Sequence, residues 1–197
     1  MPTATEVPTR DRILYASAEL FRRQGYSGTG LKQVVAQSEA PFGSIYHFFP
    51  GGKEQLAEEV LRTGGRFFLA LYESIVDSAS DLPSAVHEFF AGAAETLRST
   101  DFADACPIAT VAGEIASTND VLRRVTADVF ESWLAALEDD AVEGGVPRAS
   151  ARPLALSILA VLEGAFLLSR ALRSAEPMTA AGEAAVALVR AALADTP

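Results

Sequence analysis

Apolar residues recur at helical spacing through almost the whole chain, and glycine or proline ends most of the runs. From Arg10 onward they include Ile13, Leu20 and Phe21, and the run stops at Gly25, because glycine readily ends a helix. No segment of useful length alternates apolar and polar residues with the period of two that marks a strand. The pattern therefore predicts an all-α protein of about nine helices.

Three short helices are expected first, followed by about six longer ones. The first covers residues 10–24, and the second covers Leu31–Gln37, with Thr29 able to cap its start. The third covers Phe42–Phe48, and Pro41 can open its first turn because that turn needs no N–H donor. The longer helices are expected at Lys53 to about Ser78, Asp81 to about Thr100, Pro107–Ala116, Asn119–Glu143, Ser150–Ser174 and Pro177–Ala194.

The distribution of charge separates a slightly basic N-terminal segment from an acidic remainder. Residues 1–53 contain six basic and four acidic side chains, a net charge of +2, whereas residues 54–197 contain ten and twenty-two, a net charge of −12. This asymmetry fits a small nucleic-acid-facing head on an acidic body. We expect a disordered tail at residues 1–8, a helix-turn-helix DNA-binding domain at residues 9–52, and a ligand-binding and dimerisation domain at residues 53–197.

The single cysteine and the N-terminal sequence favour a cytoplasmic protein. Cys106 has no second cysteine with which to form an intrachain disulfide, which fits a reducing compartment. The first seven residues lack the basic and apolar regions of a signal peptide. The apolar stretch Leu154–Leu172 is long enough to raise the question of a membrane span. Because it contains Glu163 and Arg170, a helix buried at a subunit interface is preferred.

The three short helices have the spacing of a helix-turn-helix. A helix that meets DNA begins with small residues and carries hydrogen-bonding side chains, and its free N–H groups favour phosphate. The segment Gly43-Ser44-Ile45-Tyr46-His47 has this composition, with Ile45 expected in the core. The residues expected to contact DNA are Thr29, Lys32, Phe42, Gly43, Ser44, Tyr46, His47 and Lys53. The alternatives are a packing role for Tyr46 and ordinary surface roles for His47 and Lys53.

The stretch Arg12–Leu56 resembles the DNA-binding head of the TetR family of repressors. The similarity is carried by FRRQGYSGTGL at Phe21–Leu31 and by APFGSIYHFFPGGKEQL at Ala40–Leu56. Two further segments, Ala105–Ala112 and Glu163-Gly164-Ala165, are similar to the LmrA-like subgroup of that family. The resemblance implies a homodimer that binds operator DNA and controls efflux or catabolic genes in response to planar aromatic or other hydrophobic compounds.

Three positions depart from the family pattern and bear on DNA binding. The family commonly has alanine at Val35, glycine at Glu39, and lysine or arginine at Phe42. Glu39 loses the easy positive φ of glycine and brings a negative charge toward phosphate. Phe42 gives up a phosphate contact but could touch a thymine methyl group in the major groove. These departures motivate an alternative function, a small-molecule sensor or carrier whose DNA binding is weak or lost.

The C-terminal part is rich in aromatic residues that can fill a core or line a ligand cavity, and the sequence does not separate the two. The candidate ligand-binding residues are Phe67, Phe68, Leu71, Phe89, Phe90, Cys106, Pro107, Val111, Phe130, Trp133, Glu163 and Phe166. Cys106 is expected to be a buried packing thiol rather than a redox switch, because no basic residue neighbours it in sequence. Glu163 is either a polar handle in a pocket or the partner of an arginine such as Arg170.

The last two helices are apolar on more than one face, so one face must pack against their own subunit and another against a further apolar surface. A second copy of the chain is the economical cover, giving a four-helix interface and two heads about one DNA turn apart. The expected interface residues are Leu154, Ile158, Val161, Leu162, Ala165, Ala185, Leu188, Val189 and Ala192.

These features predict a repressor that leaves a palindromic operator when a small hydrophobic or aromatic effector binds the C-terminal domain. An enzyme is not expected. The chain has two histidines far apart in sequence and lacks H-E-x-x-H, Walker A and G-x-S-x-G motifs. Neither a cofactor nor a metal is expected.

Overall fold

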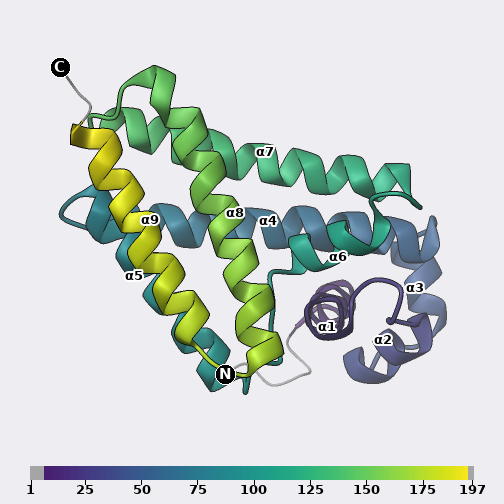
Figure 1. Ribbon diagram of the computed structural model, residues 1–197. Coiled ribbons are helices and arrows are strands. Elements are labelled where there is room, and N and C mark those ends of the chain that lie inside the picture. Colours follow the sequence, from purple (N-terminus) through teal and green to yellow (C-terminus); the bar gives the residue numbers. More distant parts are fainter. Residues whose placement is uncertain (1–6, 195–197) are drawn as a thin grey trace. The chain divides into compact units, whose positions relative to one another are not determined.

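The computed structural model describes residues 7–194, and within that range it contains nine helices and no strand. The short N-terminal helices are α1 (Thr9–Gln24), α2 (Leu31–Ser38) and α3 (Gly43–Phe48) (Figure 1). The others are α4 (Gly52–Ser78), α5 (Leu82–Ser99), α6 (Pro107–Ile115), α7 (Asp120–Glu143), α8 (Arg148–Leu172) and α9 (Glu176–Ala194). The prediction of an all-α fold with about nine helices is confirmed. Most of the tail expected at residues 1–8 lies outside the described residues.

Helix boundaries differ from the expected ones by one to two residues at several ends. Helix α5 begins as expected, because the Asp81 carboxylate accepts a hydrogen bond from the Ser84 N–H at 2.8 Å. That bond also holds the pKa of Asp81 below its usual value. Helix α8 begins at Arg148, two residues earlier than predicted, with Pro147 as its N-cap residue and Pro153 inside the helix.

The chain packs as two compact units. Within the described residues, the first combines residues 7–66 with residues 107–129, and the second combines residues 67–106 with residues 130–194. Both α4 and α7 therefore contribute residues to each unit, and α6 belongs with the short N-terminal helices. The functional boundary expected near residue 52 remains a prediction, since packing alone divides the chain differently.

The first unit is built around α1, which packs against α2, α3 and α6. In Figure 1, α1 is seen nearly end-on beside these helices. The largest side chains at its centre are fully buried: Ile13, Phe21, Ile45, Phe49, Leu56, Leu61, Ile108, Ile115 and Leu122. Removing a side chain of this kind typically costs about 2–5 kcal/mol, so the short helices are held by this core rather than by their own propensity.

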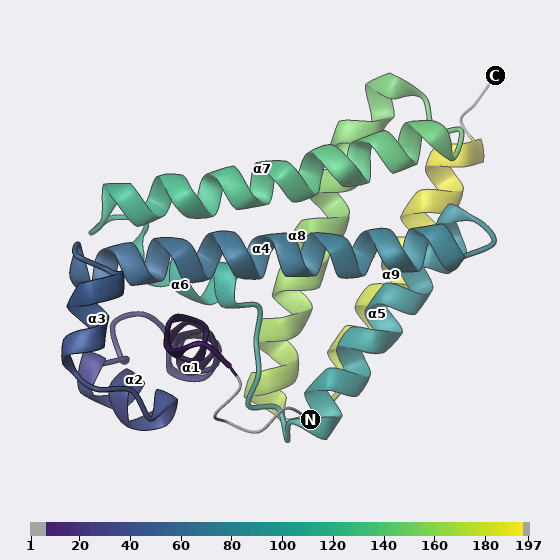
Figure 2. The same cartoon turned by 180° about the vertical axis from the view of Figure 1, so that it is seen from behind.

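The core of the second unit lies where α9 packs against both α5 and α8. The rear view shows α5 and α9 running alongside each other (Figure 2). Their close approach depends on Gly182, because a Cβ atom there would lie 2.8 Å from the Cβ of Phe90. The core around this crossing includes Phe90, Leu97, Met178 and Val189.

Two described helices, α8 and α9, are long and apolar enough to cross a bilayer by length and composition. Both contribute to the core of the second unit together with α5. Core helices of soluble proteins have the same length and composition, so these features are weak evidence for a membrane span.

Candidate DNA-binding head and effector region

The turn between α1 and α2 depends on Gly25 and on an internal threonine. Gly25 has φ +76° and ψ 179°, a conformation that is essentially restricted to glycine. The Thr29 hydroxyl donates to the Gly25 carbonyl at 2.7 Å, and the residue is buried. The N-cap of α2 is Gly30, so the prediction that Thr29 caps this helix is wrong. A buried side chain also does not fit the DNA contact expected from Thr29.

Side-chain amides complete the start of α2. The Gly30 N–H donates to Gln33 Oε1 at 2.7 Å, and Gln24 Nε2 donates to the same oxygen at 3.2 Å. Glutamine three residues after the N-cap residue satisfies a backbone donor that the helix leaves open. Lys32, in the first turn of α2, is exposed, as a phosphate-contacting residue must be.

Glu39 ends α2 in the left-handed region, with φ 52° and ψ 34°. Arg12 Nη1 donates to its carbonyl at 3.4 Å, and the Glu39 residue is exposed. As expected from the sequence, Glu39 has a strained backbone, and it carries an exposed negative charge shortly before α3. Left-handed backbone costs a residue with a Cβ about 1–2 kcal/mol.

Replacing Glu39 with glycine is expected to raise the free energy of unfolding of the head by about 0.5–1 kcal/mol, after the greater flexibility of the unfolded glycine chain is included. It is also expected to tighten DNA binding, since a negative charge is removed. Denaturant unfolding and operator titration measure the two effects. Glu39→Ala is the matched control, because it removes the charge and keeps the strain. Equal stability of the two variants would contradict the role of the backbone.

Helix α3 divides into a buried side and an outward side. Ile45 and the following Phe49 are fully buried, which anchors the helix, and the core position predicted for Ile45 is confirmed. Phe42 and Tyr46 are 48% and 53% exposed, with ring centroids 6.2 Å apart. His47 is exposed as well. Tyr46 is therefore not a packing residue, and the outward side offers an apolar ring, a phenol and an imidazole.

Lys53, near the start of α4, has an intramolecular partner. Its Nζ lies 4.2 Å from the centroid of the Tyr26 ring, in cation–π geometry. Burial lowers the pKa of Lys53, and the charge of Glu114 acts in the opposite direction. This arrangement holds the ammonium group beside the α1–α2 turn, where the sequence placed a phosphate contact.

Glu114, in the last turn of α6, is a residue that the sequence-based interpretation missed. Its Oε2 accepts a hydrogen bond from the Ser27 N–H at 2.8 Å. A Cβ at Gly25 would collide with Oε1 of the same carboxylate. Helix α6 is therefore attached to the turn that precedes α2. A lone carboxylate in the apolar run Pro107–Ile115 was the available signal.

The aromatic residues of the second unit form two runs of edge-to-face contacts. In one, Phe68 lies 5.8 Å from Phe67 and 6.1 Å from Trp133, which in turn lies 5.7 Å from Phe130 between ring centroids. In the other, Phe89 contacts Tyr72 and Phe90. Such contacts favour a rigid apolar wall.

The candidate ligand-binding residues are only partly brought together. Phe90 is buried in the core of the second unit, whereas Pro107 and Val111 are buried residues of the first unit. Phe67 and Leu71 are exposed, and the remaining aromatic residues are half-buried: Phe68, Phe89, Phe130, Trp133 and Phe166.

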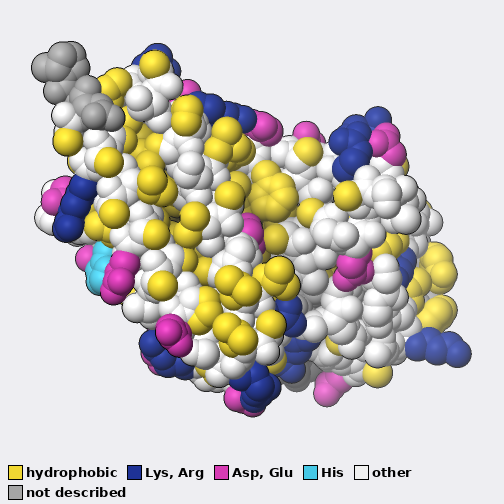
Figure 3. All heavy atoms as spheres, viewed as in Figure 1, with side chains coloured by type: hydrophobic (Ala, Val, Ile, Leu, Met, Phe, Trp, Pro, Cys, Tyr) yellow, Lys and Arg dark blue, Asp and Glu magenta, His cyan; other side chains and the backbone are white. Residues whose placement is uncertain are grey.

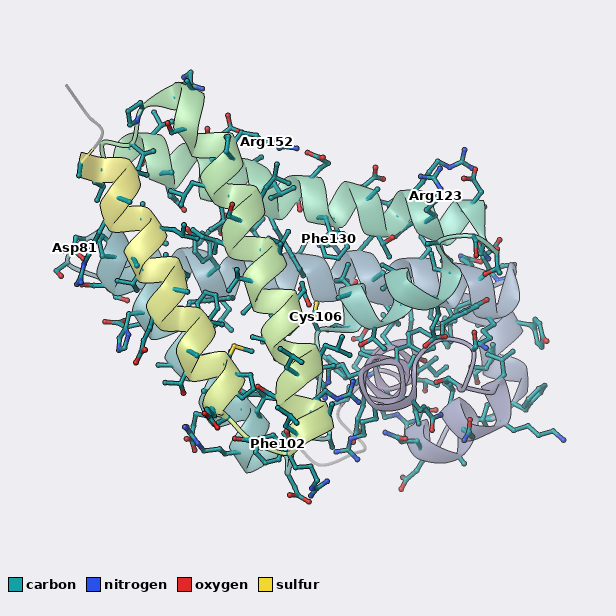
Figure 4. The ribbon with its side chains drawn as sticks, in the orientation of Figure 1. Asp81, Phe102, Cys106, Arg123, Phe130 and Arg152 are labelled. Atoms are coloured by element: carbon teal, nitrogen blue, oxygen red, sulfur yellow. The ribbon has the colours of Figure 1, made fainter. Side chains whose placement is uncertain are left out.

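Two pairs of neighbouring ionisable groups lie in the second unit. Cys106 is buried, and its thiol donates a hydrogen bond to the Glu163 carboxyl; burial raises the pKa of Glu163 to about 7. Figure 4 labels Cys106 on the segment that leads into α6. Burial also raises the pKa of Tyr72 and of Asp140, and the charge of Asp140 is a further cause of the shift at Tyr72. The sequence-based interpretation missed this second pair, because α4 and α7 are far apart in the chain.

Burial changes which residues of α8 and α9 can face a second copy. Six of the nine expected interface residues are buried in the core of their own unit: Leu154, Ile158, Leu162, Ala165, Ala185 and Val189. Val161 and Ala192 are half-buried against that core, and Leu188 is exposed. The large exposed apolar side chains of these helices are instead Leu156, Leu167, Leu168, Leu172 and Leu188. A helix surrounded by apolar residues does not reveal from its sequence which face its own subunit covers.

A three-helix head that presents a short, outward-facing third helix defines a helix-turn-helix DNA-binding protein. Residues 13–60 match the family model of bacterial regulatory proteins of the tetR family. Residues 83–184 match the model of the C-terminal domain of LmrA/YxaF-like transcriptional regulators. The chain belongs to the TetR family of transcriptional regulators and, within it, to the LmrA/YxaF-like group, as its sequence predicted.

Relatives and solved structures agree with this assignment over nearly the whole chain. The chain is 35% identical to the uncharacterized HTH-type transcriptional regulator YxaF of Bacillus subtilis, covering 92% of this chain and 95% of that protein. It is 29% identical to the HTH-type transcriptional regulator LmrA of the same organism, covering 86% and 90%. The fold resembles the crystal structure of a TetR transcriptional regulator from Legionella pneumophila, with a TM-score of 0.82 at 21% identity over 91% and 96% of the two chains.

Proposed function

We propose that the protein is a cytoplasmic, homodimeric repressor that leaves a palindromic operator when a small hydrophobic or aromatic molecule binds its C-terminal part. The observation that carries the DNA-binding half of this proposal is the outward side of α3. Phe42 and Tyr46 are half exposed there, with ring centroids 6.2 Å apart, so an apolar ring and a phenol face outward from one short segment. Phenol, imidazole and hydroxyl groups bind bases and phosphates.

The effector half of the proposal is supported by the half-buried aromatic residues of the second unit. Rings in edge-to-face contact offer a planar, apolar molecule a large area without ordering many flexible side chains. Coupling requires only that the effector bind one state of the protein better than the other, and typical couplings of about 1–3 kcal/mol change affinity roughly 5–150-fold. Helix α6 is a candidate for transmission, since Glu114 attaches it to the α1–α2 turn.

The dimer is supported by the exposed leucines of α8 and α9. In Figure 3, hydrophobic side chains gather over these two helices. Exposed alanines, such as Ala184 and Ala191 on α9, allow a partner helix to approach closely. We assign the interface to Leu156, Leu167, Leu168, Leu172 and Leu188, replacing most of the residues expected from sequence.

Tyr46→Ala and His47→Ala are each expected to weaken operator binding by about tenfold, which is the loss of one good base or phosphate contact. Tyr15 and His87 are the matched controls, because both are exposed and neither lies on α3. Fluorescence titration of labelled operator measures the effect, and it also tests the proposed function. If the α3 variants and the controls bind alike, α3 does not read DNA.

Leu167→Glu and Leu172→Glu are expected to raise the dimer dissociation constant at least tenfold, since each places a charge in an apolar contact. Val121→Glu is the control, because Val121 is exposed on α7, outside the proposed interface. Sedimentation equilibrium measures the dissociation constant. An unchanged dimer in both leucine variants would exclude this face as the interface.

A further inference from the structure

The carboxyl group of Glu163 is buried, and the described residues provide no cation for it. Its Oε1 atom is closed to solvent and has no hydrogen-bond partner among these residues. The Cys106 thiol is its hydrogen-bond donor, and a thiol is a weak donor. Burial is the main cause of its raised pKa, and no positive charge is among the causes. No ion pair with Arg170 is among the causes of the shift, and burial alone favours the protonated, neutral form of the Glu163 carboxyl group.

A buried carboxylate is stabilised most by a cation that also donates a hydrogen bond to it. Taking a carboxylate out of water is costly unless it is paired and hydrogen-bonded. A charge-assisted hydrogen bond is roughly twice as strong as one between neutral groups. A protonated amine provides both the charge and the donor, whereas an alcohol provides only the donor.

The charge of the surrounding unit favours the same class of ligand. Residues 67–106 and 130–197 contain six basic and sixteen acidic side chains, a net charge of −10. A strongly negative unit raises the local concentration of cations and lowers that of anions. A neutral aromatic ligand gains nothing from this field.

We propose that Glu163 is the anchor for the protonated nitrogen of a hydrophobic amine, and that such an amine is the effector of this regulator. The nitrogen donates to Oε1, and the apolar skeleton lies against the aromatic residues of the same unit. This inference rests on the proposed function, because it names the chemical class of the effector.

The position of Cys106 connects this anchor to the regulation of DNA binding. Cys106 immediately precedes Pro107, the first residue of α6, and Glu114 at the other end of α6 holds the α1–α2 turn. An amine bound at Oε1 and the Cys106 thiol then share the same carboxyl group. Effector binding thus acts at the residue immediately before α6.

The test uses matched amine and alcohol pairs on one-ring and two-ring skeletons, such as benzylamine with benzyl alcohol and 2-naphthylmethylamine with 2-naphthalenemethanol. Calorimetric titration of the full-length dimer is expected to show amines bound at least tenfold more tightly than their alcohols. Glu163→Gln is expected to remove this preference, so that the amine and the alcohol of each pair bind with similar affinity. Glu183→Gln, an exposed carboxylate on α9, is expected to keep it.

The proposal is overturned if alcohols bind as tightly as amines, if no amine binds, or if Glu163→Gln keeps the preference for amines. Operator binding by the same preparations is measured separately. Retained operator binding with no amine preference overturns the amine effector and leaves the repressor function standing. Amine binding without any operator binding supports the anchor and contradicts the repressor function.

Discussion

Replacing Gly25 with alanine is expected to lower the free energy of unfolding by about 2–4 kcal/mol and to weaken operator binding in parallel. Two costs combine at this position. The backbone has φ +76° and ψ 179°, which is strained for any residue with a Cβ. The added methyl group also collides with the Glu114 carboxylate, so the contact between α6 and the Ser27 N–H must shift. Denaturant unfolding and operator titration measure the two effects.

Gly113→Ala is the matched control, because Gly113 lies inside α6 with no atom near the position of an added Cβ. Alanine there is expected to stabilise the protein by about 0.5–1 kcal/mol through helix propensity. Combining Gly25→Ala with Glu114→Ala should recover the part of the loss that comes from the collision and leave the backbone cost. A Gly25→Ala protein as stable as the original would contradict the structure of this turn.

Glu163→Gln is expected to remove a pH dependence of stability of about 3 kcal/mol. The pKa of Glu163 rises from its ordinary value of 4.5 to about 7 on folding, and each tenfold gain in proton affinity corresponds to about 1.4 kcal/mol. The folded state therefore binds the proton more tightly than the unfolded state. The stabilisation is fully present below about pH 4.5 and is lost as the pH rises through 7.

The measurement compares the unfolding free energies of the original protein and Glu163→Gln from pH 4.5 to pH 8. The glutamine variant is expected to gain stability relative to the original as the pH rises. Glu183→Gln provides the control, because it makes the same chemical change at an exposed position. A flat difference for Glu163→Gln as well would show that its carboxyl is not buried.

Much of the fold could be predicted from local signals that agree with one another. Gly25 ends α1, Asp81 caps α5, and apolar residues follow the helical period between these points. The strained backbone at Glu39 was also predictable, because its position between two short helices requires a turn. The start of α2 was not, because Thr29 and Gly30 are both acceptable caps, and the Gln33 amide favours Gly30 only once the chain is folded.

Within the candidate site, the sequence predicted only those exposed side chains whose positions follow from the helix-turn-helix motif. The outward positions of Phe42, Tyr46 and His47 follow from the burial of Ile45 within one helical turn. The exposed face of α8 and α9 could not be predicted from the sequence. Both helices are apolar on several faces, and tertiary packing decides which face stays exposed. The bond from Ser27 to Glu114 and the proximity of Asp140 to Tyr72 join residues far apart in sequence, so a local sequence pattern does not reveal them.

The account depends most on the claim that two copies of the head bind one DNA site. Selection of sequences from a random DNA pool by the full-length protein tests this claim directly. We predict enrichment of an inverted repeat with half-site centres about one helical turn apart, and loss of that enrichment in the Tyr46→Ala variant. Failure to enrich any sequence, or enrichment of a single unrepeated half-site, would contradict the account and favour a sensor without DNA binding.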